Sequence, residues 1–261
     1  MKILNFEHFG DSRGNRRPLV IAHGLFGSCK NWRTISRNLS LRGVDVIAVD
    51  MRNHGQSFWD NDHSYIDLAN DLKNVIDQFG GIADVIGHSM GGKAAMTLSL
   101  NYPQSVGNLV VIDIAPITYT HDQSANIEIM ERLNLNYIES RSEADRELSK
   151  YVSDASLRAF FLQSLEIKGG THARWLINLG ALQRNMEKIM AFPKIYTSSL
   201  VDSLFIRGSM STYVEDANFS AISRYFPNSK IITVAGAGHW VHVEKQQLVM
   251  SYLIKFLLET S

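Results

Sequence analysis

The sequence predicts an α/β fold, in which a mostly parallel sheet is flanked by helices and carries an inserted helical cap. Short β-rich segments alternate with longer segments of helical period, as in proteins whose parallel strands are joined by crossover helices. Segment 109–112, Leu-Val-Val-Ile, is continuously apolar, as strands buried on both faces are. The alternation stops after Pro116 and resumes at Ser203, which indicates an insertion between two strands of one sheet.

Seven segments have the length and the β-branched or apolar content of strands. They are residues 3–9, 18–22, 45–49, 83–86, 109–112, 203–206 and 230–234. Segment 64–79 is typical of the helices between them, because its apolar residues fall on one stripe. These residues are Tyr65, Leu68, Leu72, Val75, Ile76 and Phe79.

The insertion between the strands contains no segment that has the pattern of a strand. Its apolar residues have helical spacing. They are Ile127, Met130 and Leu133, followed by Leu157, Phe160 and Phe161. We therefore expect a core of residues 1–116 and 196–261, and a helical cap of residues 117–195. Such a cap would lie over the carboxyl ends of the strands, where open α/β sheets bind ligands.

Composition excludes several classes of protein. The chain of 261 residues has 26 basic and 26 acidic side chains, and without a net charge or a basic stripe it lacks the signature of a nucleic-acid binder. Cys29 is the only cysteine, so no intramolecular disulfide can form. Residues 1–10 lack the apolar region of a secretory signal, and no apolar run is long enough to span a membrane. We expect a cytoplasmic protein, and the sequence leaves its oligomeric state open.

The run Gly87-His88-Ser89-Met90-Gly91 is a G-x-S-x-G motif. It directly follows the predicted strand 83–86 and opens a run with helical character, which is the setting of a nucleophile elbow. Glycines suit this turn because the backbone is strained and neighbouring chain must approach closely. The motif therefore predicts Ser89 as a nucleophile, and the start of the helix favours developing negative charge beside it.

A serine hydroxyl needs a base to become a nucleophile. His239 follows the last predicted strand in the run Ala235-Gly236-Ala237-Gly238, whose glycines would let the imidazole reach the carboxyl end of the sheet. His242, three residues further, is the alternative base. The order Ser, acid, His along the chain favours His239.

Acyl transfer also needs backbone N–H groups that bind the oxyanion. One is expected from Met90, the residue after the nucleophile. The other is expected from the loop His23-Gly24-Leu25-Phe26 after strand 18–22, with Leu25 favoured over Phe26 as the donor.

These motifs resemble, in order and spacing, those of the α/β-hydrolase superfamily. The runs Arg52-Asn53-His54-Gly55, Asp113 to Pro116 and Gly238 to His242 resemble the small bacterial esterases of the YbfF type. Arg52, His54 and Ser57 are expected to brace the loop after a central strand. The resemblance implies short-chain acyl esters and acyl-CoA thioesters as substrates.

The acid of the triad departs from the commoner pattern of that superfamily, in which it follows the penultimate strand. Ser211 occupies that position here, and a serine cannot stabilise an imidazolium by charge. Asp113 ends the preceding strand and would point from the carboxyl end of the sheet, and the YbfF-type resemblance supports this placement. We expect Asp113 to be the acid, with Glu215 as the alternative.

Two other functions fit parts of the sequence. The run from Gly87 to Lys93 also matches G-x-x-x-x-G-K, the signature of a phosphate-binding loop. Ala94 stands where the magnesium-binding hydroxyl of such a loop should be, and this interpretation leaves His239 unexplained. A ligand sensor with an intact triad is the second alternative, because fold and triad do not fix turnover.

The sequence thus predicts a serine esterase or thioesterase that forms an acyl-enzyme and needs no cofactor or metal. Its expected partner is a small acyl ester or thioester. The expected substrate contacts, chosen for their apolar side chains near the predicted loops and cap, are Phe26, Phe160, Phe161, Trp175 and Trp240.

Overall fold

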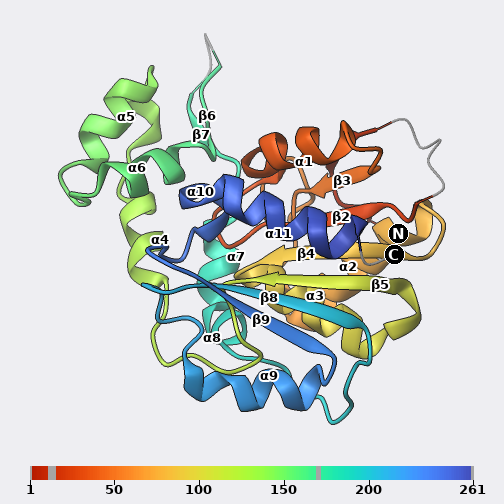
Figure 1. Cartoon of the computed structure of the whole chain (residues 1–261). Helices are drawn as coiled ribbons and strands as arrows, with labels where there is room; N and C mark the ends of the chain where they lie inside the picture. Colours follow the sequence, from red (N-terminus) through yellow and green to blue (C-terminus); the bar gives the residue numbers. More distant parts are fainter. Residues whose placement is uncertain (1, 11–15, 169–171, 260–261) are drawn as a thin grey trace.

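A seven-stranded sheet forms the centre of the protein in a computed structural model, which describes residues 2–10, 16–168 and 172–259 (Figure 1). The order of the strands is β1-β3-β2-β4-β5-β8-β9. β1 pairs antiparallel with β3 and the other pairs are parallel. The strands are β1 (Phe6–Phe9), β2 (Leu19–Ala22), β3 (Val46–Val49), β4 (Ala83–His88), β5 (Val106–Ile112), β8 (Asp202–Gly208) and β9 (Ser229–Val234).

Each of the seven predicted strand segments overlaps one of these strands, and the predicted fold class is confirmed. The first strand is shorter than predicted, beginning at Phe6 rather than at residue 3. The strands that carry the candidate site extend further than their apolar cores, since β4 runs on through Gly87 to His88. Side-chain type marks the buried centre of a strand, whereas ladder hydrogen bonds set its ends.

Helices cover both faces of the sheet. Successive residues of each strand point to opposite sides, and apolar side chains on both sides pack against helices. In β2, Val20 packs in the core under one layer of helices and Ile21 packs under the other. One layer is α2 (Tyr65–Gln78), α3 (Met90–Asn101) and α9 (Phe219–Tyr225). The opposite layer is α1 (Arg33–Ser40) and α11 (Gln246–Leu258).

The chain between β5 and β8 forms a separate group of short elements at one end of the sheet (Figure 1). They pack around a hydrophobic cluster of their own, which Phe26 of the core joins. The helices are α4 (Ser124–Glu131), α5 (Arg141–Leu148), α6 (Ala155–Leu162), α7 (Leu179–Arg184) and α8 (Met186–Met190).

The expectation that this segment contains no strand is wrong. β6 (Leu165–Glu166) and β7 (Arg174–Trp175) pair antiparallel. Each has only two residues, which is too short to produce an alternating pattern in the sequence. Across the described ranges, none of the helices combines the length and apolar character needed to cross a bilayer.

Candidate active site

Ser89 lies at a sharp turn between β4, which ends at His88, and α3, which begins at Met90. Its backbone has φ 52° and ψ −119°, a left-handed conformation that a residue with a side chain adopts only under strain. A side-chain carbon at Gly91 would lie 2.4 Å from the carbonyl oxygen of Ala22. The glycine therefore lets α3 pack directly on β2, and the turn places Ser89 in the lining of a large cavity.

Asp113 directly follows β5, and its carboxylate is buried. Oδ2 lies 2.8 Å from Nδ1 of His239 and also accepts a hydrogen bond from the hydroxyl of Ser211. Oδ1 accepts a hydrogen bond from the backbone N–H of Gly208 at 2.9 Å. A carboxylate accepts and does not donate, so Nδ1 of His239 carries a proton in this contact.

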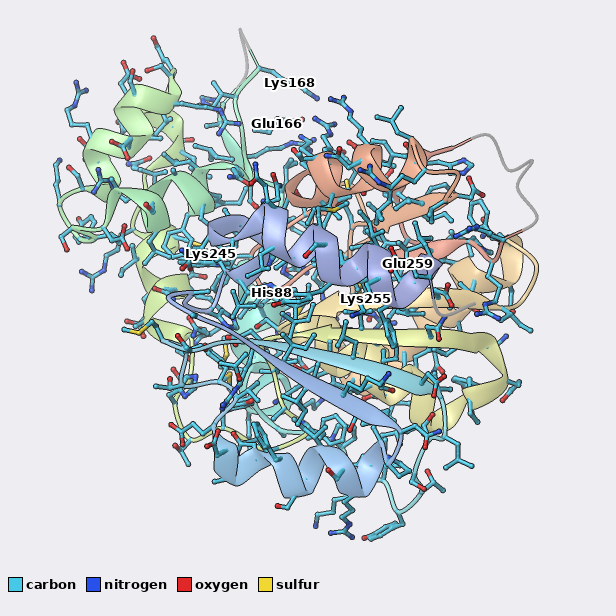
Figure 2. The ribbon with its side chains drawn as sticks, viewed as in Figure 1. His88, Glu166, Lys168, Lys245, Lys255 and Glu259 are labelled. Atoms are coloured by element: carbon cyan, nitrogen blue, oxygen red, sulfur yellow. The ribbon has the colours of Figure 1, made fainter. Side chains whose placement is uncertain are left out.

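The imidazole of His239 is held on further sides. The ring of Tyr213 stacks on it with centroids 3.9 Å apart and an interplanar angle of 21°. Nε2 of His88 donates to the backbone carbonyl of His239 at 3.0 Å. His88 itself lies close to α10 (Val241–Glu244), as Figure 2 shows. Its ring, like that of His239, lines the cavity of Ser89.

The alternative base and the alternative acid have other roles. His242 stacks on Trp32 with centroids 4.4 Å apart, and burial lowers the pKa of His242 to about 3. Within the described part of the chain, its Nδ1 has no hydrogen-bond partner. Glu215 is exposed and caps a short 3-10 helix at Asp216–Asn218, and it is not among the residues that line the cavity. Asp113 is thus the carboxylate that contacts His239.

The cavity beside Ser89 has a volume of about 830 Å³. Four of the five predicted substrate contacts line it, namely Phe26, Phe160, Phe161 and Trp240. The fifth, Trp175, packs in the hydrophobic cluster of the inserted segment and donates to the carbonyl of Met130 at 3.2 Å. This corrects its expected place in the pocket, because its indole N–H finds a partner inside the segment.

Both residues expected to bind an oxyanion, Leu25 and Met90, line the same cavity. The N–H of Phe26 already donates to Nε2 of His54 at 3.2 Å, which favours Leu25 over Phe26 as the candidate donor from this loop. In the described residues, no group of three or more His, Cys, Asp or Glu side chains is arranged to hold a metal ion.

Lys93 is a buried cation at the cavity wall whose role the sequence analysis did not identify. Its Nζ donates to the carbonyls of Met190 and Ala191, both at 2.8 Å, and lies 4.6 Å from the ring centre of Tyr119. A phosphate-binding loop would need this ammonium free, so its contacts with the end of α8 disfavour that interpretation. Burial lowers the pKa of Lys93 to about 7.

A family model, related sequences and a solved structure all place this chain in the same family. A family model described as alpha/beta hydrolase fold matches residues 17–246. The sn-1-specific diacylglycerol lipase ABHD11 of Mus musculus is 39% identical over 249 residues, covering 92% of this chain and 80% of the relative. The esterase YbfF of Escherichia coli K12 is 34% identical over 264 residues, covering 98% and 99%.

Among solved structures, a marine microorganism esterase superposes with a TM-score of 0.93 at 34% identity. The match covers 98% of this chain and 100% of that one. The thioesterase domain of the curacin biosynthetic pathway is 16% identical with a TM-score of 0.71, and this likeness concerns the fold alone.

The buried ammonium predicts a pH dependence of stability. In the unfolded chain the pKa of Lys93 returns to 10.5, so above the folded value of about 7 the unfolded state binds more protons and stability increases with pH. Between about pH 7 and pH 9, the free energy of unfolding of the wild type should rise by about 2 kcal/mol relative to Lys93→Met.

Urea unfolding at several pH values measures this difference. Lys255→Met provides the control, because Lys255 is exposed on α11, and its difference from the wild type should stay constant. A constant difference for Lys93→Met as well would show that burial does not disfavour the charged form of Lys93.

Proposed function

Because this chain belongs to the alpha/beta hydrolase fold family and is a carboxylic ester hydrolase, we propose that Ser89, His239 and Asp113 are its catalytic triad. The 2.8 Å contact between the buried carboxylate of Asp113 and Nδ1 of His239 carries this proposal. It supports an imidazole whose Nδ1 carries a proton, which leaves Nε2 to act as the base beside the cavity that Ser89 and His239 both line.

The proposed reaction proceeds through an acyl-enzyme. Nε2 of His239 takes the hydroxyl proton of Ser89 while the serine oxygen attacks the substrate carbonyl, and Asp113 stabilises the imidazolium that forms. The N–H groups of Leu25 and Met90 donate to the oxyanion, aided by the start of α3. His239 then protonates the leaving alcohol or thiol. Water, deprotonated by the same histidine, releases the acid and regenerates Ser89.

We further propose that residues 117–195 act as a cap over a core of residues 1–116 and 196–261. The hydrophobic cluster that this segment forms, in which Phe26 is the buried residue from the core, supports the division. Phe160 and Phe161 of α6 line the cavity together with Trp240, and the rings of Phe160 and Trp240 lie 5.5 Å apart. The cap would therefore form one wall of the acyl site and exclude water from it.

For the substrate we propose short-chain acyl esters and acyl-CoA thioesters, since His239 can protonate an alcohol or a thiol leaving group. The volume of about 830 Å³ lies in the upper part of the range of small-molecule pockets, which is about 300–1,000 Å³. It thus also has room for a longer acyl chain. Together with the name of the mouse relative, this volume makes a glycerolipid ester the second candidate.

A substrate panel distinguishes these candidates. Nitrophenyl esters and the matching acyl-CoA thioesters, from acetyl to palmitoyl, would be compared with a diacylglycerol by their kcat/KM values. We expect the largest values for short acyl groups. Values that rise steadily to palmitoyl, or that are largest for diacylglycerol, would instead support the glycerolipid ester.

Ser89→Ala should abolish hydrolysis and leave the fold intact, because it removes one hydroxyl from the cavity wall. A loss of about 10⁴-fold or more in kcat is expected from comparable triad variants. Ser220→Ala, at an exposed position on α9, is the control and should keep wild-type activity. A Ser89→Ala protein with more than about a tenth of wild-type kcat would exclude Ser89 as the nucleophile. If the wild type itself fails to turn over aryl esters, a ligand sensor becomes the better interpretation.

Asp113→Asn should reduce kcat by up to about 10⁴-fold, because the amide favours the wrong imidazole tautomer and cannot stabilise its cation. Glu215→Gln should have little effect, since Glu215 is exposed and caps a 3-10 helix. The two variants would be compared under identical conditions with the same ester. A larger loss in Glu215→Gln would mean that the acid follows the penultimate strand after all.

A further inference from the structure

The loop that carries Leu25 has three successive peptide groups, and each is held by a hydrogen bond. The first joins Gly24 to Leu25. Its carbonyl accepts hydrogen bonds from Nδ1 of His23 at 2.8 Å and from the N–H of Gly27 at 3.0 Å. The described chain contains no cis peptide bond, so the N–H of Leu25 points away from this carbonyl. With the carbonyl held on one side, the N–H of Leu25 has no backbone acceptor on the other among the described residues.

The second peptide group joins Leu25 to Phe26, and its N–H donates to Nε2 of His54 at 3.2 Å. Phe26 has φ 65°, a left-handed conformation that costs a residue with a side chain of order 1–3 kcal/mol. Such a conformation persists only where the surroundings hold it. The contact with His54 is one such restraint.

The third peptide group joins Phe26 to Gly27, and its carbonyl accepts a hydrogen bond from Oγ of Ser164 at 2.9 Å. Ser164 is buried and follows α6 in the inserted segment. The peptide group before Phe26 is therefore held by His54 of the core, and the peptide group after it is held by Ser164 of the inserted segment.

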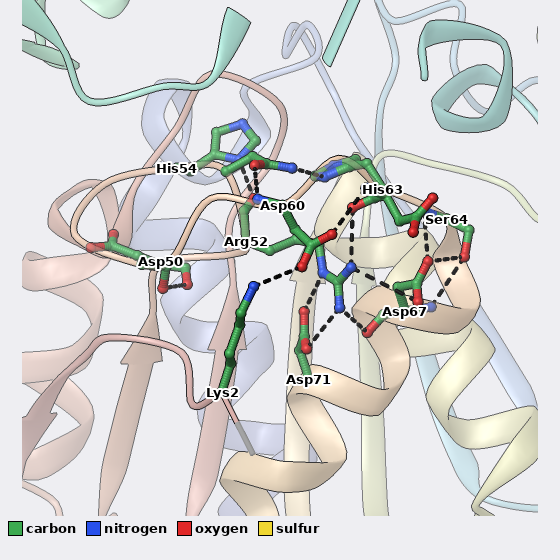
Figure 3. A network of polar contacts seen from close by, with 12 residues as sticks. Lys2, Asp50, Arg52, His54, Asp60, His63, Ser64, Asp67 and Asp71 are labelled. Atoms are coloured by element: carbon green, nitrogen blue, oxygen red, sulfur yellow. Dashed lines mark hydrogen bonds and ion pairs between the residues drawn. The ribbon is translucent and has the colours of Figure 1, made fainter. Parts of the chain in front are cut away.

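His54 is itself fixed as an acceptor. Its Nδ1 donates to the carbonyl of Arg52 at 2.9 Å, which leaves a lone pair on Nε2 for Phe26. Burial lowers the pKa of His54 to about 3, so the ring stays neutral near neutral pH. The guanidinium of Arg52 is paired with Asp71 of α2, and Figure 3 shows this network around His54. Through Arg52, His54 is therefore connected by hydrogen bonds to α2 of the core.

We propose that His54 and Ser164 are positioning residues that aim the Leu25 amide at the oxyanion by holding the peptide groups on both sides of Phe26. This inference rests on the proposed function. It makes the inserted segment a structural part of the oxyanion site, since Ser164 belongs to that segment. Neither side chain reacts with substrate. Their effect is on the direction of one N–H, and a misplacement of about 1 Å can cost about 10²-fold in rate.

Ser164→Ala tests the proposal with the smallest change. It should lower kcat by about tenfold, below the 10²–10³-fold loss for complete removal of an oxyanion donor. KM should stay within about twofold, because the ground state of the substrate makes little use of the amide. A trifluoromethyl ketone, which forms an oxyanion on Ser89, should bind more weakly by the same factor as kcat. Ser149→Ala, exposed at the end of α5, is the control.

His54 is tested by a pair of variants. Gln can present its side-chain oxygen near the position of Nε2, whereas Leu has no acceptor. His54→Gln should therefore keep more kcat and more ketone affinity than His54→Leu, and melting temperatures would show that both variants are folded. If either fails to fold, Ser164→Ala alone decides.

Different results would contradict the positioning role of Ser164 and the catalytic triad. Unchanged kcat and ketone affinity in Ser164→Ala, while Ser89→Ala is inactive, would overturn the positioning role and leave the triad in place. An active Ser89→Ala protein would overturn the triad itself. A fall in melting temperature with kcat and ketone affinity unchanged would show that Ser164 is only structural, and would also overturn the proposal.

Discussion

The buried carboxylate of Asp113 is the constraint on which the rest of the site depends. An unpaired carboxylate away from water costs many kcal/mol, so it must find hydrogen-bond donors. Here the donors are the N–H of Gly208, the hydroxyl of Ser211 and Nδ1 of His239. Gly208 ends β8 and His239 follows β9. The hydrogen bonds to this one carboxylate therefore connect the ends of β5, β8 and β9, and they orient the imidazole of His239 in the cavity.

The sequence predicts those parts of the fold and site that local patterns determine. Apolar centres locate the inner strands β2, β3, β4, β5 and β8, because strands buried on both faces are continuously apolar. The sharp turn at Ser89 could be predicted from the glycines of its motif, since the turn after β4 leaves no room for a side chain at Gly91. Asp113 could be predicted from its place at the end of β5, where its carboxylate does reach His239.

The contacts between distant segments could not be predicted, because packing rather than local pattern decides them. In the sequence Ser211 only occupies the usual place of the acid, yet in the structure its hydroxyl donates to Asp113 across 98 positions of the chain. Lys93 matches a phosphate-binding motif, but the end of α8 supplies its carbonyl partners. Trp175 is an aromatic residue in the right segment that packs away from the cavity. The strands β6 and β7 are too short to leave a signal.

In this structure Asp113, rather than an acid after the penultimate strand, holds the imidazole of His239. Proton NMR of protein labelled with ¹⁵N-histidine tests it directly, because an Nδ1 proton shared with a buried carboxylate resonates far downfield of the amide protons. We expect such a signal for His239 in the wild type and in Glu215→Gln, and its loss in Asp113→Asn. A signal that survives in Asp113→Asn, or that disappears in Glu215→Gln, would show that Asp113 is not the acid that holds this imidazole.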